Sequence, residues 1–201
     1  KSVDFGNSWV SIVNYASFSL FTTESYMLIG DVFQGIHKYD NYSLLSHPLS
    51  LGKDIERIDG FVTLGNKIFA ASAFQGVFKS TDDGASWTVS NIGIPSIVNH
   101  FQQTDSALYI DAGGNGIWKT KDFGQNWTFL DTSIMIRDIS TFLVGQKDSM
   151  IYAGSNYGMI YRSSNNAISW DDSAQLNNWI KGRILKIFEI DTVVYAAQIN
   201  T

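Results

Sequence analysis

The chain has 201 residues, of which 44% are hydrophobic and 14% aromatic, while only 16% are charged. This apolar and aromatic share is too high for a disordered chain. The 14 basic residues are scattered among 19 acidic ones, which gives a net charge of -5 and no footprint for nucleic acid. The absence of cysteine excludes disulfides and thiol catalysis, and no apolar run approaches the roughly 18 residues of a membrane span. Frequent glycines and aromatic residues with few charges favour strands, so the sequence predicts an all-β protein.

A repeat of about 40 residues runs through the chain. Trp9, Trp87, Trp127 and Trp170 mark one phase of it, with spacings of 78, 40 and 43 residues. The first spacing equals two steps of 39, and the skipped copy lies upstream, where residues 35–38 match residues 76–79 and 116–119. A short apolar segment precedes each copy, and these predicted strands are Tyr26–Gly30, Ile68–Ala71, Leu108–Asp111, Ile151–Gly154 and Val193–Ala197. Self-similarity at this period indicates a repeat architecture.

Each repeat has room for four strands. In the third repeat the expected strands are 96–102, 107–111, 116–120 and 126–130, separated by turns rich in Gly, Asn and Asp. No segment of about ten residues or more has a helical period. Four short strands in about 40 residues, repeated along the chain, predict one propeller blade per repeat.

The sequence therefore predicts a single β-propeller domain over residues 1–201. About five repeats are visible, approximately 11–56, 57–95, 96–136, 137–182, and 183–201 together with 1–10. The last strand and the first residues belong to complementary parts of one repeat. Two arrangements stay open: a five-bladed ring completed by the two ends, or part of a ring of about six to eight blades.

A turn motif recurs at the tryptophan phase. Residues 80–87 and 2–9 fit the pattern Ser/Thr-x-Asp-x-Gly-x-Ser/Thr-Trp, and residues 120–127 depart from it only at Asn126. Residues 163–170 are more divergent, with Asn165 in place of Asp and Ala167 in place of Gly. These turns resemble the Asp-box, or BNR, repeat family of β-propellers, in particular its bacterial extracellular type. The resemblance spans essentially the whole chain.

The resemblance implies a structural role for the residues of the motif, which are Ser2, Asp4, Gly6, Trp9, Ser80, Asp82, Gly84, Trp87, Thr120, Asp122, Gly124, Trp127 and Trp170. Glycine tolerates the positive φ of the hairpin, and Asp accepts backbone N–H groups of its own turn. Each Trp is expected to pack beneath its turn. One Asp per turn falls short of the six to eight oxygen ligands of Ca²⁺, so no metal or cofactor is expected.

Glycoside hydrolysis is the activity most often associated with such propellers. Arg57-Ile58-Asp59 begins like the sialidase Arg-Ile-Pro motif but lacks its Pro. Xyloglucanase-type enzymes use two Asp on long loops, and the longer connections here are Ser43–Ile58 and Asp171–Arg183. Asp54, Glu56 and Asp171 lie on them, but long solvated turns are the favoured interpretation. No catalytic residue is assigned, and the three histidines lack the spacing of metal ligands.

The turns between the second and third strands of the repeats are the candidate binding surface. They carry Phe33, Gln34, Phe74, Gln75, Asn115 and Tyr157. Aromatic and amide side chains gathered at one end of a propeller suit a shallow site for sugar or peptide, whereas packing between blades is the favoured alternative.

Taken with the resemblance, the sequence predicts a non-catalytic recognition or scaffold domain of a secreted or cell-surface bacterial protein. Its expected partners are a glycan or protein ligand and further domains, and its expected location is extracellular, periplasmic or at the cell surface. A fragment of a carbohydrate-active hydrolase is the alternative.

Overall fold

The computed structural model describes residues 2–11, 16–33, 35–40, 46–49, 57–113, 115–130, 139–145, 150–171 and 182–199. In these ranges every regular element is a β-strand, which confirms the predicted all-β class. Within the same ranges, no helix is long and apolar enough to cross a membrane.

The strands form five antiparallel sheets, each built from strands that follow one another in sequence. Sheet 1 contains β1 (Ser17–Thr22), β2 (Tyr26–Asp31), β3 (Ile36–Asp40) and β4 (Ser46–Leu49). Sheet 2 contains β5 (Ile58–Leu64), β6 (Lys67–Ser72), β7 (Gly76–Ser80) and β8 (Thr88–Val89). Sheet 3 contains β9 (His100–Thr104), β10 (Ala107–Asp111), β11 (Ile117–Thr120) and β12 (Thr128–Leu130). Sheet 4 contains β13 (Ile139–Val144), β14 (Ile151–Ser155) and β15 (Ile160–Ser163), and sheet 5 contains β16 (Arg183–Ile190) and β17 (Val193–Ile199).

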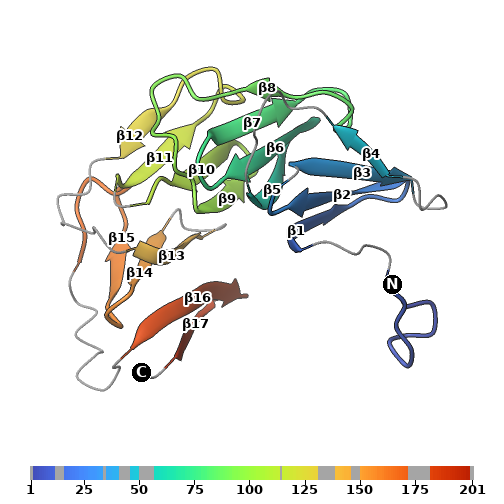
Figure 1. Ribbon diagram of the computed structural model, residues 1–201. Helices are drawn as coiled ribbons and strands as arrows, with labels where there is room; N and C mark the ends of the chain where they lie inside the picture. The colour runs from blue at the N-terminus through green and yellow to red at the C-terminus, as the bar shows by residue number, and fades with distance from the viewer. Residues whose placement is uncertain are drawn as a thin grey trace.

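The five sheets follow one another along an arc (Figure 1). Their first strands, β1, β5, β9, β13 and β16, lie on the inner side, and each contacts the next one along the arc. The arc is open between sheet 5 and sheet 1, and residues 2–10 lie apart from the sheets on the sheet 1 side of the opening (Figure 1). The described residues therefore form consecutive sheets without closing a ring.

The hydrophobic core lies between successive sheets. Leu28 and Ile58 are buried in the interface between sheets 1 and 2, and Phe69 and Leu108 are buried in the interface between sheets 2 and 3. Tyr109 and Phe142 belong to the interface between sheets 3 and 4. The central residues of the second strand of each of these sheets are apolar, and the strand is covered on both faces, as Leu28 and Phe69 illustrate with 0% exposure. Each such side chain contributes roughly 1.5–3 kcal/mol by its burial.

A β-bulge recurs in the inner strands. The register shifts between Ser17 and Ser19 in β1 and between Ile58 and Gly60 in β5. Equivalent shifts occur between Ile139 and Thr141 in β13 and between Ile184 and Lys186 in β16. The four shifts each leave one residue without a directly paired partner, namely Phe18, Asp59, Ser140 and Leu185. Bulges bend a strand and increase its twist, which suits inner strands that splay from one sheet to the next.

Candidate functional site

Four turns carry the motif found in the sequence, and we call residues 2–9, 80–87, 120–127 and 163–170 the box turns. In the second of them Asp82 Oδ1 accepts the backbone N–H of Ser86 at 2.8 Å, and Ser80 Oγ accepts that of Gly84 at 2.8 Å. The hydroxyl of Ser86 donates to Asp82 Oδ2. The hydroxyl of Ser86 first, then its backbone N–H and the hydroxyl of Ser80, lower the pKa of Asp82 to about 2. The polar groups of the turn thus satisfy one another's hydrogen bonds.

The same bonds recur in the other box turns. Asp4 accepts the N–H of Ser8 and Asp122 that of Asn126, both at 2.9 Å. In the fourth turn Asn165 takes the place of Asp and accepts the N–H of Ser169 at 2.9 Å. The glycines have φ values of 90°, 78° and 74° at Gly6, Gly84 and Gly124, and the residue before each one is also left-handed, as Phe5, Asp83 and Phe123 show with 57°, 56° and 60°.

The tryptophans of the box turns differ in burial. Trp127 is only 8% exposed, and its indole Nε1 donates to the carbonyl of Ser90 in sheet 2 at 2.9 Å. Trp87 and Trp170 are half-buried. The expectation that every Trp packs beneath its turn is wrong for Trp9, which is 74% exposed because no sheet lies beside the N-terminal turn.

At the opposite end of the sheets, the second strands of sheets 1 to 4 each end in one polar residue, which fixes the turn that follows. Asp31 Oδ1 accepts the N–H of Phe33 at 2.6 Å, and the hydroxyls of Ser72 and Ser155 accept those of Phe74 and Tyr157 at 3.4 and 3.2 Å. Asp111 accepts the N–H of Gly113 in the same way at 3.0 Å. This repeated turn places an aromatic side chain at the same point of sheets 1, 2 and 4.

We call Phe33, Phe74 and Tyr157 the aromatic rim. Their side chains are 80%, 56% and 72% exposed, so the alternative that they pack between blades does not describe them. Asn115 of sheet 3 turns its amide onto the carbonyls of Ala112 and Gly113 at 3.2 and 3.0 Å. Gln75 is half-buried, and its backbone carbonyl accepts a hydrogen bond from the side-chain amide of Asn91. Gln34 lies outside the described residues.

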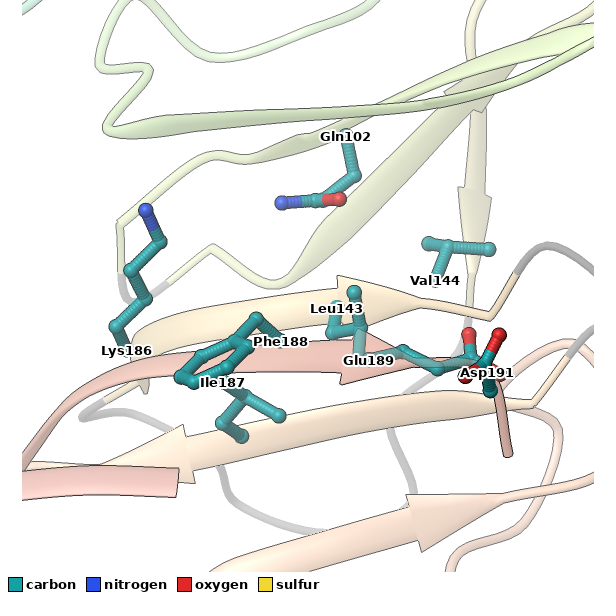
Figure 2. A pocket seen from close by; sticks show the side chains of 8 residues that line it. All are labelled: Gln102, Leu143, Val144, Lys186, Ile187, Phe188, Glu189 and Asp191. Atoms are coloured by element: carbon teal, nitrogen blue, oxygen red, sulfur yellow. The ribbon is translucent and has the colours of Figure 1, made fainter. Parts of the chain in front are cut away.

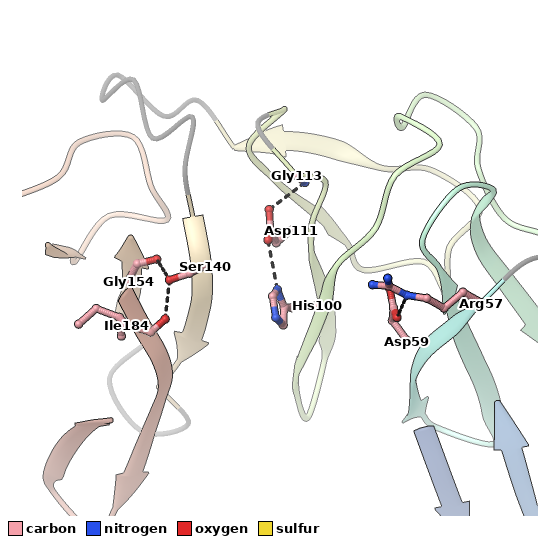
Figure 3. A network of polar contacts seen from close by, with 8 residues as sticks. All are labelled: Arg57, Asp59, His100, Asp111, Gly113, Ser140, Gly154 and Ile184. Atoms are coloured by element: carbon pink, nitrogen blue, oxygen red, sulfur yellow. Dashed lines mark hydrogen bonds and ion pairs between the residues drawn. The ribbon is translucent and has the colours of Figure 1, made fainter. Parts of the chain in front are cut away.

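Arg57 joins the rim of sheet 1 to that of sheet 2. Its N–H donates to the carbonyl of Val32 at 2.9 Å, and its own carbonyl accepts the N–H of Ala73 at 3.1 Å. Its guanidinium binds both oxygens of Asp59, at 2.6 and 3.0 Å (Figure 3). The guanidinium also lies over the ring of Phe18, 4.7 Å from the centroid. The hydrogen bond to Asp59 raises the pKa of Arg57.

A second polar group lies on the next sheet. His100 Nδ1 is 3.2 Å from Asp111 Oδ2, and Asp111 is fully buried while the His100 side chain is 40% exposed (Figure 3). Further along the arc, the hydroxyl of Ser140 is within hydrogen-bond distance of the carbonyls of Gly154 at 3.1 Å and Ile184 at 2.5 Å. Arg57, His100 and Ser140 therefore form a row of polar groups across three sheets.

The inner strands enclose a groove made of two adjoining cavities of about 340 and 480 Å³, which share Gln102, Lys186 and Ile187. We call this the inner groove. In the larger cavity Lys186 lies at one end and the carboxylates of Glu189 and Asp191 at the other (Figure 2). The ring of Phe188 lies between them, and the Gln102 amide projects from above (Figure 2). The smaller cavity reaches Asp59 and His100, so it opens toward the end that carries the aromatic rim.

Sequence reasoning did not select Gln102, Lys186, Glu189 or Asp191. Each lies on the first strand of a repeat or directly after it. The first strand is the part of the repeat whose sequence is least similar from one copy to the next. They could have been identified by their position, because the first strand of each sheet is an edge strand and lines the groove.

Of the carboxylates on the two longer connections, Asp54 and Glu56 lie outside the described residues. Asp171 pairs with the guanidinium of Arg162 at 3.0 Å on an exposed surface. Within the described part of the chain, no cluster of three or more His, Asp or Glu side chains could hold a metal ion.

No family model matches the sequence, and no curated protein matches it. Solved structures do resemble the fold. An extracellular domain assigned to a hybrid two-component system of B. thetaiotaomicron matches 97% of this chain with a TM-score of 0.70 and 12% identity. A second such domain from the same organism matches 92% with a TM-score of 0.68 and 17% identity. An ancestral GH74 enzyme matches 78% with a TM-score of 0.60 and 15% identity.

The chain spans 27%, 25% and 24% of the length of these three proteins. At such identities the likeness concerns the fold alone. Together with the consecutive antiparallel sheets, it shows that this chain has a fold of the β-propeller type.

Proposed function

We propose that this chain is a non-catalytic recognition module of a secreted or cell-surface bacterial protein, built from Asp-box blades, and that its aromatic rim binds carbohydrate. The observation that carries the proposal is the repeated turn that holds Phe33, Phe74 and Tyr157 at equivalent positions with 80%, 56% and 72% of their side chains exposed. Apolar rings gathered at one end of the sheets offer a surface for a ligand, whereas a single exposed ring needs no explanation.

The polar groups beside the rim suit the same ligand. Carbohydrate sites combine flat apolar platforms with a few fixed hydrogen-bonding groups. Arg57 and Asp59 are held by their bidentate pair, and the imidazole of His100 is held by buried Asp111. Asp59 and His100 line the inner groove, so the sugar rings would stack on the rim and their hydroxyls would face the groove.

The location of the module is supported by the resemblance to two extracellular domains. Because the chain spans about a quarter of those proteins, further domains in the parent protein are part of the proposal.

The test is a glycan array followed by calorimetry with the best oligosaccharide. Replacing Phe33 and Phe74 together by Ser is expected to weaken binding at least roughly a hundredfold, if each ring contributes about 1.4 kcal/mol, because one tenfold step corresponds to that energy. The melting temperature should stay unchanged. Ile168→Ala, a 68% exposed apolar residue of the fourth box turn, is the matched control at the other end of the sheets and should bind normally. Binding that survives the double substitution would refute the rim as the site.

Glycoside hydrolysis is the second candidate. The observation that favours it is the pair of carboxylates, Glu189 and Asp191, at one end of the inner groove (Figure 2), since such hydrolysis uses two carboxyl groups across a scissile bond. Release of reducing sugar, abolished by Glu189→Gln, would establish this activity. Binding without release supports the recognition module instead.

A further inference from the structure

The larger cavity of the inner groove keeps charges of opposite sign apart. Lys186 lies at one end, the carboxylates of Glu189 and Asp191 lie at the other, and the ring of Phe188 lies between them (Figure 2). Among the described residues, none of the salt bridges includes any of these three charged side chains. Two neighbouring carboxylates repel each other, and a positive group placed beside them relieves that repulsion. The cavity is therefore complementary to a ligand with a positive group at one end and a negative group at the other.

The spacing of these charges along β16 defines the length of that ligand. Lys186 and Glu189 are three positions apart in a stretch of β16 whose pairing with β17 is uninterrupted. Three positions correspond to about 10 Å in a β-strand. An extended tripeptide spans about 10 Å as well. The volume of the cavity, about 480 Å³, lies in the range of small-ligand sites. A tripeptide with free ends thus matches the cavity in both length and charge.

The edge of β16 suits the main chain of a peptide. Among the described strands, β16 pairs with β17 alone, so it is an edge strand. In an antiparallel pair, alternate residues direct their N–H and C=O groups away from the partner strand. Near the rim, the carbonyl of Ile184 accepts the hydroxyl of Ser140 at 2.5 Å, whereas the residues from Lys186 to Glu189 line the cavity. An extended peptide can add its own amide groups along such an edge, and an oligosaccharide has none to add.

The middle of the cavity is apolar, with one polar group above it. Phe188 is 38% exposed, and Val144 of β13 is buried beside it in the wall of the cavity. The side-chain amide of Gln102 projects from above toward the space between the charged ends (Figure 2). An apolar side chain on the middle residue of the ligand would lie on the Phe188 ring, and Gln102 is within the same cavity to bind a peptide group.

We propose that the larger cavity binds a peptide of about three residues with free ends, which lies along β16. Its ammonium group is bound by Glu189 and Asp191, its terminal carboxylate is bound by Lys186, and its middle side chain packs on Phe188. The peptide therefore runs antiparallel to β16. This site is separate from the aromatic rim, and the inference does not rest on carbohydrate binding there.

The test uses a pool of tripeptides of the form Ala-Xaa-Ala and the whole chain. Binding is followed by NMR, and members with an apolar middle residue are expected to shift the amide signals of Ile187 and Glu189. The tightest member is then compared with its N-acetylated form and with its C-terminal amide. Each of these modifications should weaken binding at least about tenfold, because each removes one charged contact.

Variants assign each end of the peptide to its partner. Lys186→Met should weaken binding of the free peptide at least about tenfold but leave binding of the C-terminal amide unchanged, because the amide has no carboxylate. Asp191→Asn should weaken binding of the free peptide and leave that of the N-acetylated form unchanged. A misfolded variant would lose both ligands, so the selective loss separates the site from the fold.

Asp105→Asn is the matched control. Asp105 begins the turn between β9 and β10 as Asp191 begins the turn between β16 and β17, but it does not line the cavity. This variant should bind the free peptide normally.

Three results would overturn the proposal. The first is that no member of the pool binds more tightly than about 1 mM. The second is that the acetylated and amidated peptides bind as well as the free one, which would show that the charges do not select the ligand. The third is that Lys186→Met or Asp191→Asn weakens binding of the modified and the free peptides alike.

Discussion

Trp127 and Ser90 connect sheet 3 to sheet 2 by two reciprocal hydrogen bonds. The indole Nε1 of Trp127 donates to the carbonyl of Ser90 at 2.9 Å, and the hydroxyl of Ser90 donates to the carbonyl of Gly124 at 2.6 Å, in the turn that leads to that tryptophan. Trp87 makes no such bond across a junction, because its Nε1 donates to Gly84 in its own turn at 3.2 Å. The two tryptophans share a motif but not an energetic role.

We therefore expect Trp127→Ala to cost about 3–5 kcal/mol in the free energy of unfolding, in the range of large buried aromatics. Trp87→Ala should cost clearly less, since Trp87 is half-buried. Urea unfolding followed by circular dichroism measures both. Trp127→Phe keeps most of the apolar surface and isolates the hydrogen bond. Equal losses in the free energy of unfolding for the two alanine variants would contradict a special role of the Trp127–Ser90 contact.

Gly124 is expected to be intolerant of a side chain for two separate reasons. Its φ of 74° strains any L residue, and an added Cβ would collide with the hydroxyl oxygen of Ser90 and lie 3.0 Å from Phe69. Gly93 has a similar φ of 87°, but its nearest neighbour would be 4.0 Å away. Gly93→Ala should thus lose only the backbone term, on the order of 1 kcal/mol. Gly124→Ala should lower the free energy of unfolding by more than this in the same urea experiment. Equal losses for the two variants would show that the contact between the sheets accommodates the added methyl group without destabilising the fold.

Acid should loosen the box turns over a defined range. The pKa of Asp82 and that of Asp122 are lowered to about 2 by the hydrogen bonds they accept, from an ordinary value of 3.8. A carboxyl whose pKa is lower in the folded state adds stability that is complete above its unfolded pKa and is lost as pH falls toward the folded one. Stability should therefore decrease between about pH 4 and pH 2.

The double variant Asp82→Asn, Asp122→Asn should flatten this decrease in urea midpoints measured from pH 6 to pH 2. Asn165→Asp supplies the converse control, because Asn165 occupies the same place in the fourth turn and cannot titrate. It should steepen the decrease. An unchanged pH profile in both variants would show that these carboxylates do not carry the acid dependence.

His37 should add a second pH dependence at higher pH. It is 3% exposed, and burial lowers its pKa below 6.5, although the carboxylate of Asp31, 3.8 Å away, opposes the shift. The unfolded chain then takes up the proton first, so stability is lost as pH falls below about 6.5. His37→Phe, which introduces the residue that Phe78 provides at the equivalent position, should remove this loss. A profile that His37→Phe does not alter would refute the assignment.

The sequence predicts the second strands well because they are covered on both faces and read as apolar runs, as Leu28 and Phe69 show. The box turns were also predictable, since each is a local network of side chains and backbone within eight residues. The exposure of Phe33 and Phe74 was not, because burial depends on whether a neighbouring sheet reaches the turn. Equally, no local pattern reveals that Arg57 binds Asp59, or that β9 and β16 bring Gln102 and Lys186 to one groove.

The bulge of the inner strands has an evolutionary consequence. Because the bulged residue is skipped by the pairing, its side chain can change without altering the register of the sheet. The residue at this position differs in chemical class in each of the four bulged strands, being aromatic, acidic, a hydroxyl-bearing residue and aliphatic, namely Phe18, Asp59, Ser140 and Leu185. Two of them, Asp59 and Leu185, line the inner groove. Randomising Asp59 and Leu185 is thus a route to new specificities on an unchanged scaffold.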